Sequence, residues 1–100
     1  MNTRRVVVTG IGGITAFGRD WQSIQTAFKA EKNAVKYMDW SGRFPELEAQ
    51  LGAPIEGYSP PAHWTRKQLR SMGRVSHLCV DAAEQALTDA GLLGDESITD

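Results

Sequence analysis

Residues 5–11, with the sequence Arg-Val-Val-Val-Thr-Gly-Ile, constrain the fold of this chain more than any other feature. The run is rich in β-branched residues, ends at a glycine and does not alternate between apolar and polar positions. It therefore predicts a central strand buried on both faces, as in parallel or mixed α/β sheets. Because such a strand needs a neighbour on each side, we expect an α/β fold.

Helical spacing of apolar residues predicts two amphipathic helices. The first runs from residue 21 to about residue 30, and Asp20 precedes it as an N-cap. The second covers residues 75–90, where the apolar positions hold a helical repeat through four turns. Gly91 is a suitable residue to end this helix.

The remaining elements are shorter. Glycines at positions 10, 12 and 13 predict a tight turn after the first strand. Residues 34–40 and 51–55 predict two short strands, and Thr65 can cap a helical turn that begins at Arg66. These strands are too short and too polar to flank a doubly buried strand. We therefore expect residues 1–100 to be the N-terminal part of a larger fold, without an internal domain boundary.

Composition excludes several classes of protein. The 100 residues are 41% hydrophobic and 23% charged with a net charge of −1, which is typical of a folded domain and not of a nucleic-acid-binding protein. A single cysteine and the lack of a Cys/His cluster argue against a disulfide framework and a metal site. The apolar runs are far shorter than the ~20 residues that cross a bilayer. We expect a cytoplasmic protein without a metal or cofactor.

The glycines after the first strand invite a comparison with dinucleotide-binding turns. A G-x-G-x-x-G motif beginning at Gly10 and Gly12 would need a third glycine where Thr15 stands. The related T-G-x-x-x-G-x-G pattern would need glycines at Ile14 and Ala16. We therefore expect these glycines to serve the backbone, with a nucleotide-binding α/β protein as the alternative.

No catalytic group is expected among these residues. Cys79 lies within the apolar stripe of the long helix, which predicts a buried and unreactive thiol. His77 is two residues away, and side chains at that spacing on a helix do not face each other. His63 precedes Trp64 in a proline-rich loop and is expected at the surface. The acidic residues of 81–100 predict a solvated face.

Charge is unevenly distributed along the chain. Residues 57–80 contain four basic and no acidic residues, whereas residues 81–100 contain six acidic and no Lys or Arg. Arg66, Lys67 and Arg70 share one side of the predicted helical turn, because Arg70 is four residues from Arg66 and three from Lys67. A local basic patch on a nearly neutral chain predicts an acidic partner. A solvated surface without a partner is the alternative.

Three stretches of the sequence, by their order and spacing, indicate a known family. They are residues 4–12 (RRVVVTGIG), 66–74 (RKxxRxMxR) and 83–92 (AxxALxDAGL). The first continues through Phe17-Gly18 into the helix that bears Ala27. With these stretches the chain resembles the β-ketoacyl-[acyl-carrier-protein] synthases of the elongating, bacterial type. Residues 36–60 resemble them poorly.

The resemblance implies the N-terminal portion of a thiolase-like fold with α-β-α-β-α layers, in a dimeric protein several times longer. The implied enzyme is an acyltransferase of fatty-acid or polyketide biosynthesis. An acyl chain passes from its carrier protein to a cysteine, malonyl-carrier protein loses carbon dioxide, and the resulting carbanion attacks the thioester. The cysteine and two histidines of the family lie beyond residue 100, so none corresponds to Cys79, His63 or His77.

The resemblance also implies that the basic turn docks the acidic acyl carrier protein. Lys67 and Arg70 match basic positions of the family, and Arg66 matches in type. Ser71 departs from the pattern, since many relatives have a lysine there, so docking is expected to be weaker or shifted toward Arg74. A non-catalytic partner subunit of the chain-length-factor type and a self-contained interaction module are the alternatives. The unpaired first strand counts against the second of these.

Overall fold

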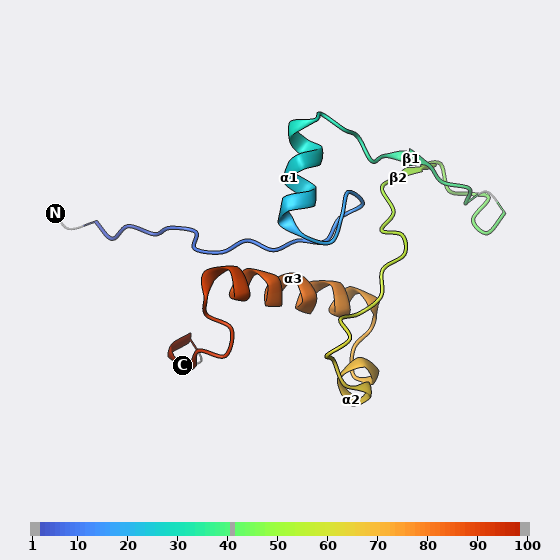
Figure 1. Ribbon diagram of the computed structural model, residues 1–100. Coiled ribbons are helices and arrows are strands. Elements are labelled where there is room, and N and C mark those ends of the chain that lie inside the picture. The colour runs from blue at the N-terminus through green and yellow to red at the C-terminus, as the bar shows by residue number, and fades with distance from the viewer. Residues whose placement is uncertain (1–2, 41, 99–100) are drawn as a thin grey trace.

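Three helices form most of the regular structure in the computed structural model, which describes residues 3–40 and 42–98. They are α1 (Trp21–Lys29), α2 (Arg66–Arg70) and α3 (Arg74–Ala90). The short strands β1 (Lys36–Tyr37) and β2 (Leu51–Gly52) pair antiparallel, and a 3-10 turn, η1, spans Glu96–Ile98. Figure 1 shows the N-terminal segment running between α1 and α3, with the β1–β2 pair projecting to one side.

The two amphipathic helices form where the sequence predicts them. Asp20 caps α1 by accepting a hydrogen bond from the Ser23 N–H at 2.8 Å, and this bond lowers the pKa of the Asp20 carboxyl group. Ile24 and Ala27 on the apolar face of α1 are buried. Helix α3 ends at Gly91, whose φ of 73° lies in the left-handed region that favours glycine.

The predicted basic turn and short strands are also present. The Thr65 hydroxyl accepts from the Gln68 N–H, and the Gln68 side chain accepts from the Thr65 N–H, so α2 begins with a complete capping box. The two strands are shorter than predicted. Each has only two residues, with Lys36 opposite Gly52 in the register.

The predicted first strand is the main disagreement between sequence and structure. Residues 5–11 are extended but unpaired, and Val6 and Val8 are 94% and 80% exposed. Within the described residues the segment is not the buried central strand of a sheet, because neither β1 nor β2 lies beside it. The two short strands do not flank it, as the sequence led us to expect. The radius of gyration is 17.8 Å, against about 13 Å for a compact domain of this length, which reflects the same open arrangement.

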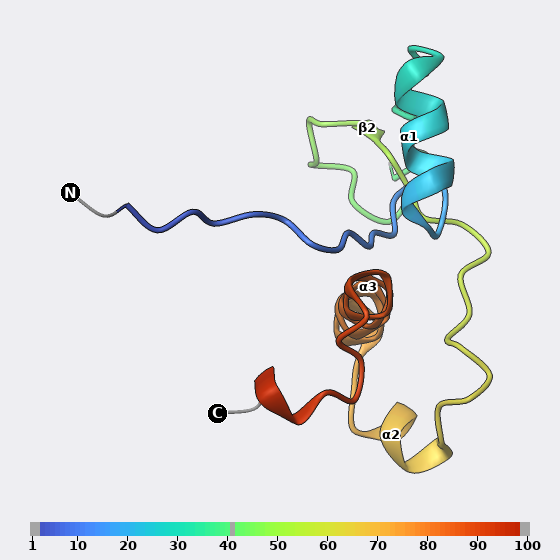
Figure 2. The ribbon, with the colours of Figure 1, turned by 60° about the vertical axis from the view of Figure 1, so that its left-hand side comes forward.

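The glycines of the N-terminal segment permit close packing and do not form the predicted tight turn. That turn lies at residues 15–18, where two backbone hydrogen bonds close it at 2.8 and 3.1 Å. Gly10 and Gly12 instead lie against α3, and Figure 2, in which α3 is seen nearly end-on, shows the segment crossing above this helix. A Cβ atom on Gly10 would lie 2.2 Å from the Ala86 carbonyl oxygen, and one on Gly12 would lie 2.3 Å from that of Ala82.

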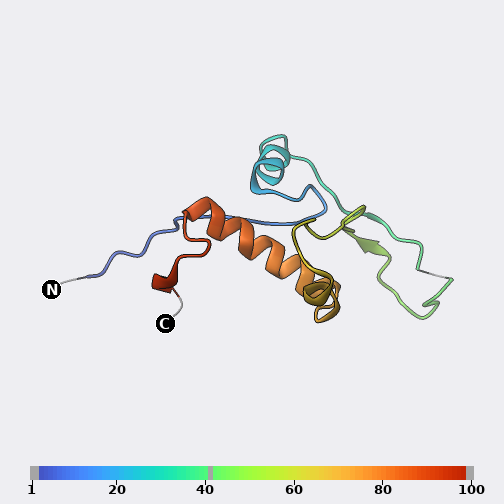
Figure 3. The same ribbon diagram turned by 60° about the horizontal axis from the view of Figure 1, so that its bottom comes forward.

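The apolar stripe of α3 is only partly covered. Leu78 is half-buried, but Val75 is 79% exposed and Cys79 is also exposed. The prediction of a buried Cys79 thiol is therefore wrong for this chain, since no described element covers that side of the helix. Figure 3 shows α3 with α2 at its beginning and the N-terminal segment on another side. None of the described helices is both long and apolar enough to span a membrane.

Candidate functional site

The basic residues predicted from the sequence lie at the surface around α2. Arg66, Lys67 and Arg70 are exposed, and none of them forms an ion pair with another described residue. The Ser71 hydroxyl donates to the Gln68 carbonyl oxygen at 2.8 Å and closes the end of the short helix. The structure thus presents three cations on a well-capped turn without acidic neighbours along that turn.

Arg74 differs from the other three basic residues. It is the first residue of α3, and its guanidinium donates to the Ile55 carbonyl oxygen at 2.8 Å. The same group lies 5.9 Å from the centre of the Tyr58 ring. Although Arg74 is exposed, part of its hydrogen-bonding capacity already holds the loop that precedes α2.

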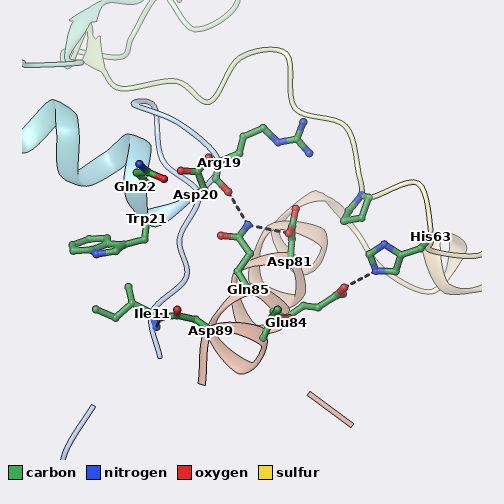
Figure 4. A pocket seen from close by; sticks show the side chains of 12 residues that line it. Ile11, Arg19, Asp20, Trp21, Gln22, His63, Asp81, Glu84, Gln85 and Asp89 are labelled. Carbon is green, nitrogen blue, oxygen red and sulfur yellow. Dashed lines mark hydrogen bonds and ion pairs between the residues drawn. The ribbon is translucent and has the colours of Figure 1, made fainter. Parts of the chain in front are cut away.

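The acidic residues of 81–98 are partly the solvated face expected from the sequence: Asp89, Asp95 and Glu96 are exposed, whereas Glu84 is half-buried and Asp81 is buried. Asp81 is only 7% exposed, and Asp89 accepts a hydrogen bond from the Ile11 N–H at 3.0 Å. Gln85 donates to the Arg19 carbonyl oxygen at 2.7 Å and to the Asp81 carboxylate at 3.1 Å, as Figure 4 shows. The prediction is therefore wrong for Asp81, which the network buries, while Asp89 and Gln85 hold the N-terminal segment against α3.

Tyr58 joins the loop before α2 to the same network. Its hydroxyl donates to the Asp81 carboxylate at 3.0 Å, and the Arg19 guanidinium lies 4.9 Å from the centre of its ring. Arg19 also donates to the Ser59 carbonyl oxygen at 2.6 Å. Burial raises the pKa of the Tyr58 hydroxyl, and the hydrogen bond to Asp81 raises it further.

This shifted group gives a testable pH dependence in the protein that contains this segment. Because the folded state holds the Tyr58 proton more tightly, its contribution to the unfolding free energy is complete below the ordinary tyrosine pKa of about 10. The contribution is lost as pH rises through the raised folded-state value. The native protein should have a higher free energy of unfolding than a Tyr58→Phe variant. Chemical denaturation from pH 8 to pH 11 should show this difference constant at first and shrinking only above about pH 10. An advantage that grows there would contradict this assignment.

Beside this network lies an open hollow of about 660 Å³, lined from the N-terminal segment, α1 and α3. Its polar groups are largely engaged with one another, and the described residues contain no cluster of three or more His, Cys, Asp or Glu suited to a metal ion. The N–H groups of Ile11 and Gly13 already donate to Asp89 and Gln85. The glycines at 10 and 12 pack closely against α3 and do not form a phosphate-binding turn at the start of a helix, which counts against the nucleotide-binding alternative.

The two histidines have structural partners and do not combine with Cys79. His63 pairs with the Glu84 carboxylate at 2.5 Å, and a ring nitrogen of His77 lies 3.2 Å from the Leu69 carbonyl oxygen. Glu84 also accepts a hydrogen bond from Trp64. These contacts, and those of Tyr58 and Asp81, are not predicted from the sequence. One signal was present, because polar residues at 77, 81, 85 and 89 recur every four residues along one side of α3.

The whole arrangement can be compared with known proteins. Residues 3–99 match the family described as "Beta-ketoacyl synthase, N-terminal domain". The chain therefore belongs to this family.

Two curated relatives and one solved structure illustrate the similarity. Nodulation protein E from Rhizobium leguminosarum bv. trifolii is 39% identical over 93 residues, which cover 93% of this chain and 23% of the relative. 3-Oxoacyl-[acyl-carrier-protein] synthase 2 from Synechocystis sp. is 29% identical over 98 residues, which cover 96% and 23%. The crystal structure of a beta-ketoacyl synthase from Burkholderia phymatum is 52% identical with a TM-score of 0.81, over 96% of this chain and 24% of that chain.

The chain thus spans about a quarter of the length of the proteins it matches. The agreement with the Burkholderia phymatum structure extends over 96% of this chain, including segments that make few contacts with one another within these residues. The open arrangement is accordingly that of a part of a larger β-ketoacyl synthase fold, and the uncovered apolar side chains of residues 6–8 and of α3 fit this conclusion.

Proposed function

We propose that this chain is the N-terminal part of a β-ketoacyl synthase that condenses an acyl thioester with malonyl-acyl carrier protein, with loss of carbon dioxide. Family membership and the close structural match to a beta-ketoacyl synthase support this proposal. The proposed catalytic cysteine and histidines lie beyond residue 100. Within residues 1–100, taken as one part without a domain boundary, the role is to build the fold and to recognise the carrier.

We propose further that the basic turn of α2 docks the acyl carrier protein. The observation that carries this proposal is the capped, exposed turn whose three cations lack acidic neighbours. Lys67 and Arg70 would meet acidic carrier residues directly, with Arg66 beside them and Arg74 at the edge. Because these contacts are exposed, each is worth about 0.2–1 kcal/mol and weakens as salt increases.

Three other expectations go with this proposal. The complete protein would have the thiolase-like layered fold, would form a homodimer and would use no cofactor. In that fold, strands from the remaining three quarters of the protein would pair with residues 5–11. The cytoplasmic location expected from the sequence stays a prediction.

A condensation assay on the complete protein tests the proposed reaction. Purified protein supplied with acyl- and malonyl-loaded carrier protein should release carbon dioxide and form a 3-oxoacyl thioester. Product that forms only after a second synthase subunit is added would indicate the non-catalytic partner subunit instead. A folded protein that forms no product under either condition would contradict the proposed activity.

A further inference from the structure

Helix α2 depends on its neighbours for its orientation. It is five residues long, and none of its side chains is buried. A helix this short has little stability of its own, so the direction of its basic side is set by contacts at its ends and along its backbone. Two residues of α3, His77 and Glu84, provide such contacts.

Glu84 fixes the chain immediately before α2. Trp64 precedes the N-cap residue Thr65 and is only 9% exposed. Its indole N–H donates to one carboxylate oxygen of Glu84 at 3.0 Å, while His63 pairs with the other oxygen at 2.5 Å. One carboxylate therefore holds two consecutive side chains at the entrance to the helix.

His77 fixes the backbone within α2. Its Nε2 atom lies 3.2 Å from the Leu69 carbonyl oxygen, and because a carbonyl can only accept, this nitrogen carries the proton. The rings of His77 and Trp64 are also in edge contact, with centroids 6.0 Å apart. His77 and Glu84 are seven residues apart, two turns along the same side of α3. Together they attach α2 to the longer helix at two points.

We infer that Trp64, His77 and Glu84 are positioning residues, which orient the basic side of α2 for an acidic partner without touching that partner. This inference rests on the proposed docking function. The three residues hold α2 through a buried indole, a shared carboxylate and a ring-to-carbonyl hydrogen bond. Loss of these contacts leaves the charges of Lys67 and Arg70 in place but lets the orientation of α2 vary. Recognition of the carrier then weakens, while the chemical step is unaffected.

Substitution of Trp64 tests this role in the complete synthase. Trp64→Phe keeps an aromatic ring but removes the N–H that Glu84 accepts, and loss of one such hydrogen bond should raise KM for carrier-bound substrate about threefold. kcat, and turnover of a pantetheine thioester without carrier protein, should stay at the wild-type level. Trp21→Phe, the same change on α1 away from α2, should leave KM unchanged for both substrates. Glu84→Ala should raise the same KM, and Glu84→Gln, which keeps an acceptor oxygen, should largely restore it.

A double-mutant cycle separates positioning from a general loss of structure. In a Lys67→Glu/Arg70→Glu background, Trp64→Phe should cause no further rise in KM, because the two attractive charges that it orients have been reversed. Additive effects, or equal loss with carrier-bound and carrier-free substrates, would overturn the inference. If the charge reversal itself leaves KM unchanged, the docking proposal fails, and the inference fails with it. If the reversal acts but Trp64→Phe does not, only the positioning role fails.

Discussion

Replacing Gly10 with alanine is expected to destabilise the synthase that contains this segment. The new Cβ atom would lie 2.2 Å from the Ala86 carbonyl oxygen and 2.8 Å from the Ala90 Cβ atom. Neither atom can rotate away, because both are fixed by the backbone of α3. Relief requires the N-terminal segment and the helix to separate, and overpacking of this kind costs about 1–3 kcal/mol or more.

Thermal unfolding and soluble yield measure this effect, and Gly42 provides the matched control. A Cβ atom on Gly42 would meet nothing within 4 Å. Gly42→Ala should therefore change the unfolding free energy by no more than about 0.5 kcal/mol. Equal melting temperatures for Gly10→Ala and Gly42→Ala would show that the segment does not pack against α3 in the way described.

Features of the fold that depend on residues close together in the sequence could be predicted from it. The Asp20 cap, the Thr65 cap and the left-handed Gly91 each act within one helical turn, so their residue types are sufficient evidence. The pairing of residues 5–11 could not be predicted in this way. A β-branched run indicates a buried strand, but burial depends on partner strands, and β1 and β2 do not provide them.

The same distinction between local and distant residues applies to the candidate site. The basic residues of α2 were evident from the sequence, because their charges and helical spacing can be read directly. The contacts of Tyr58 with Asp81 and of Trp64 with Glu84 join residues 20 or more positions apart. Only the packing of the loop on α3 brings these pairs together. This is also why the burial of Asp81 could not be predicted.

Reversing the charge at Lys67 and Arg70 should weaken recognition of the carrier protein. In the Lys67→Glu/Arg70→Glu variant, two attractive contacts with an acidic partner become repulsive, so KM for carrier-bound substrate should rise several-fold at low salt. Electrostatic effects of this kind act on encounter and on its salt dependence more than on chemistry. The difference from wild type should therefore shrink as ionic strength increases.

A matched charge change elsewhere separates docking from the effect of total charge. Lys29 is the last residue of α1 and Lys32 follows three residues later; both are exposed and lie away from α2. Lys29→Glu with Lys32→Glu alters the net charge by the same amount and should leave KM for carrier-bound substrate near the wild-type value. A similar rise in KM for both double variants would point to a long-range charge effect without a defined docking surface.

The most direct measurement of the docking surface is the ratio of kcat/KM for carrier-bound and carrier-free thioester, compared between the native synthase and the Lys67→Glu/Arg70→Glu variant at low salt. Docking on α2 predicts a ratio several-fold lower in the variant, with carrier-free turnover unchanged. An unchanged ratio, whether both substrates keep full turnover or lose it equally, would contradict the proposal that this basic turn receives the carrier protein.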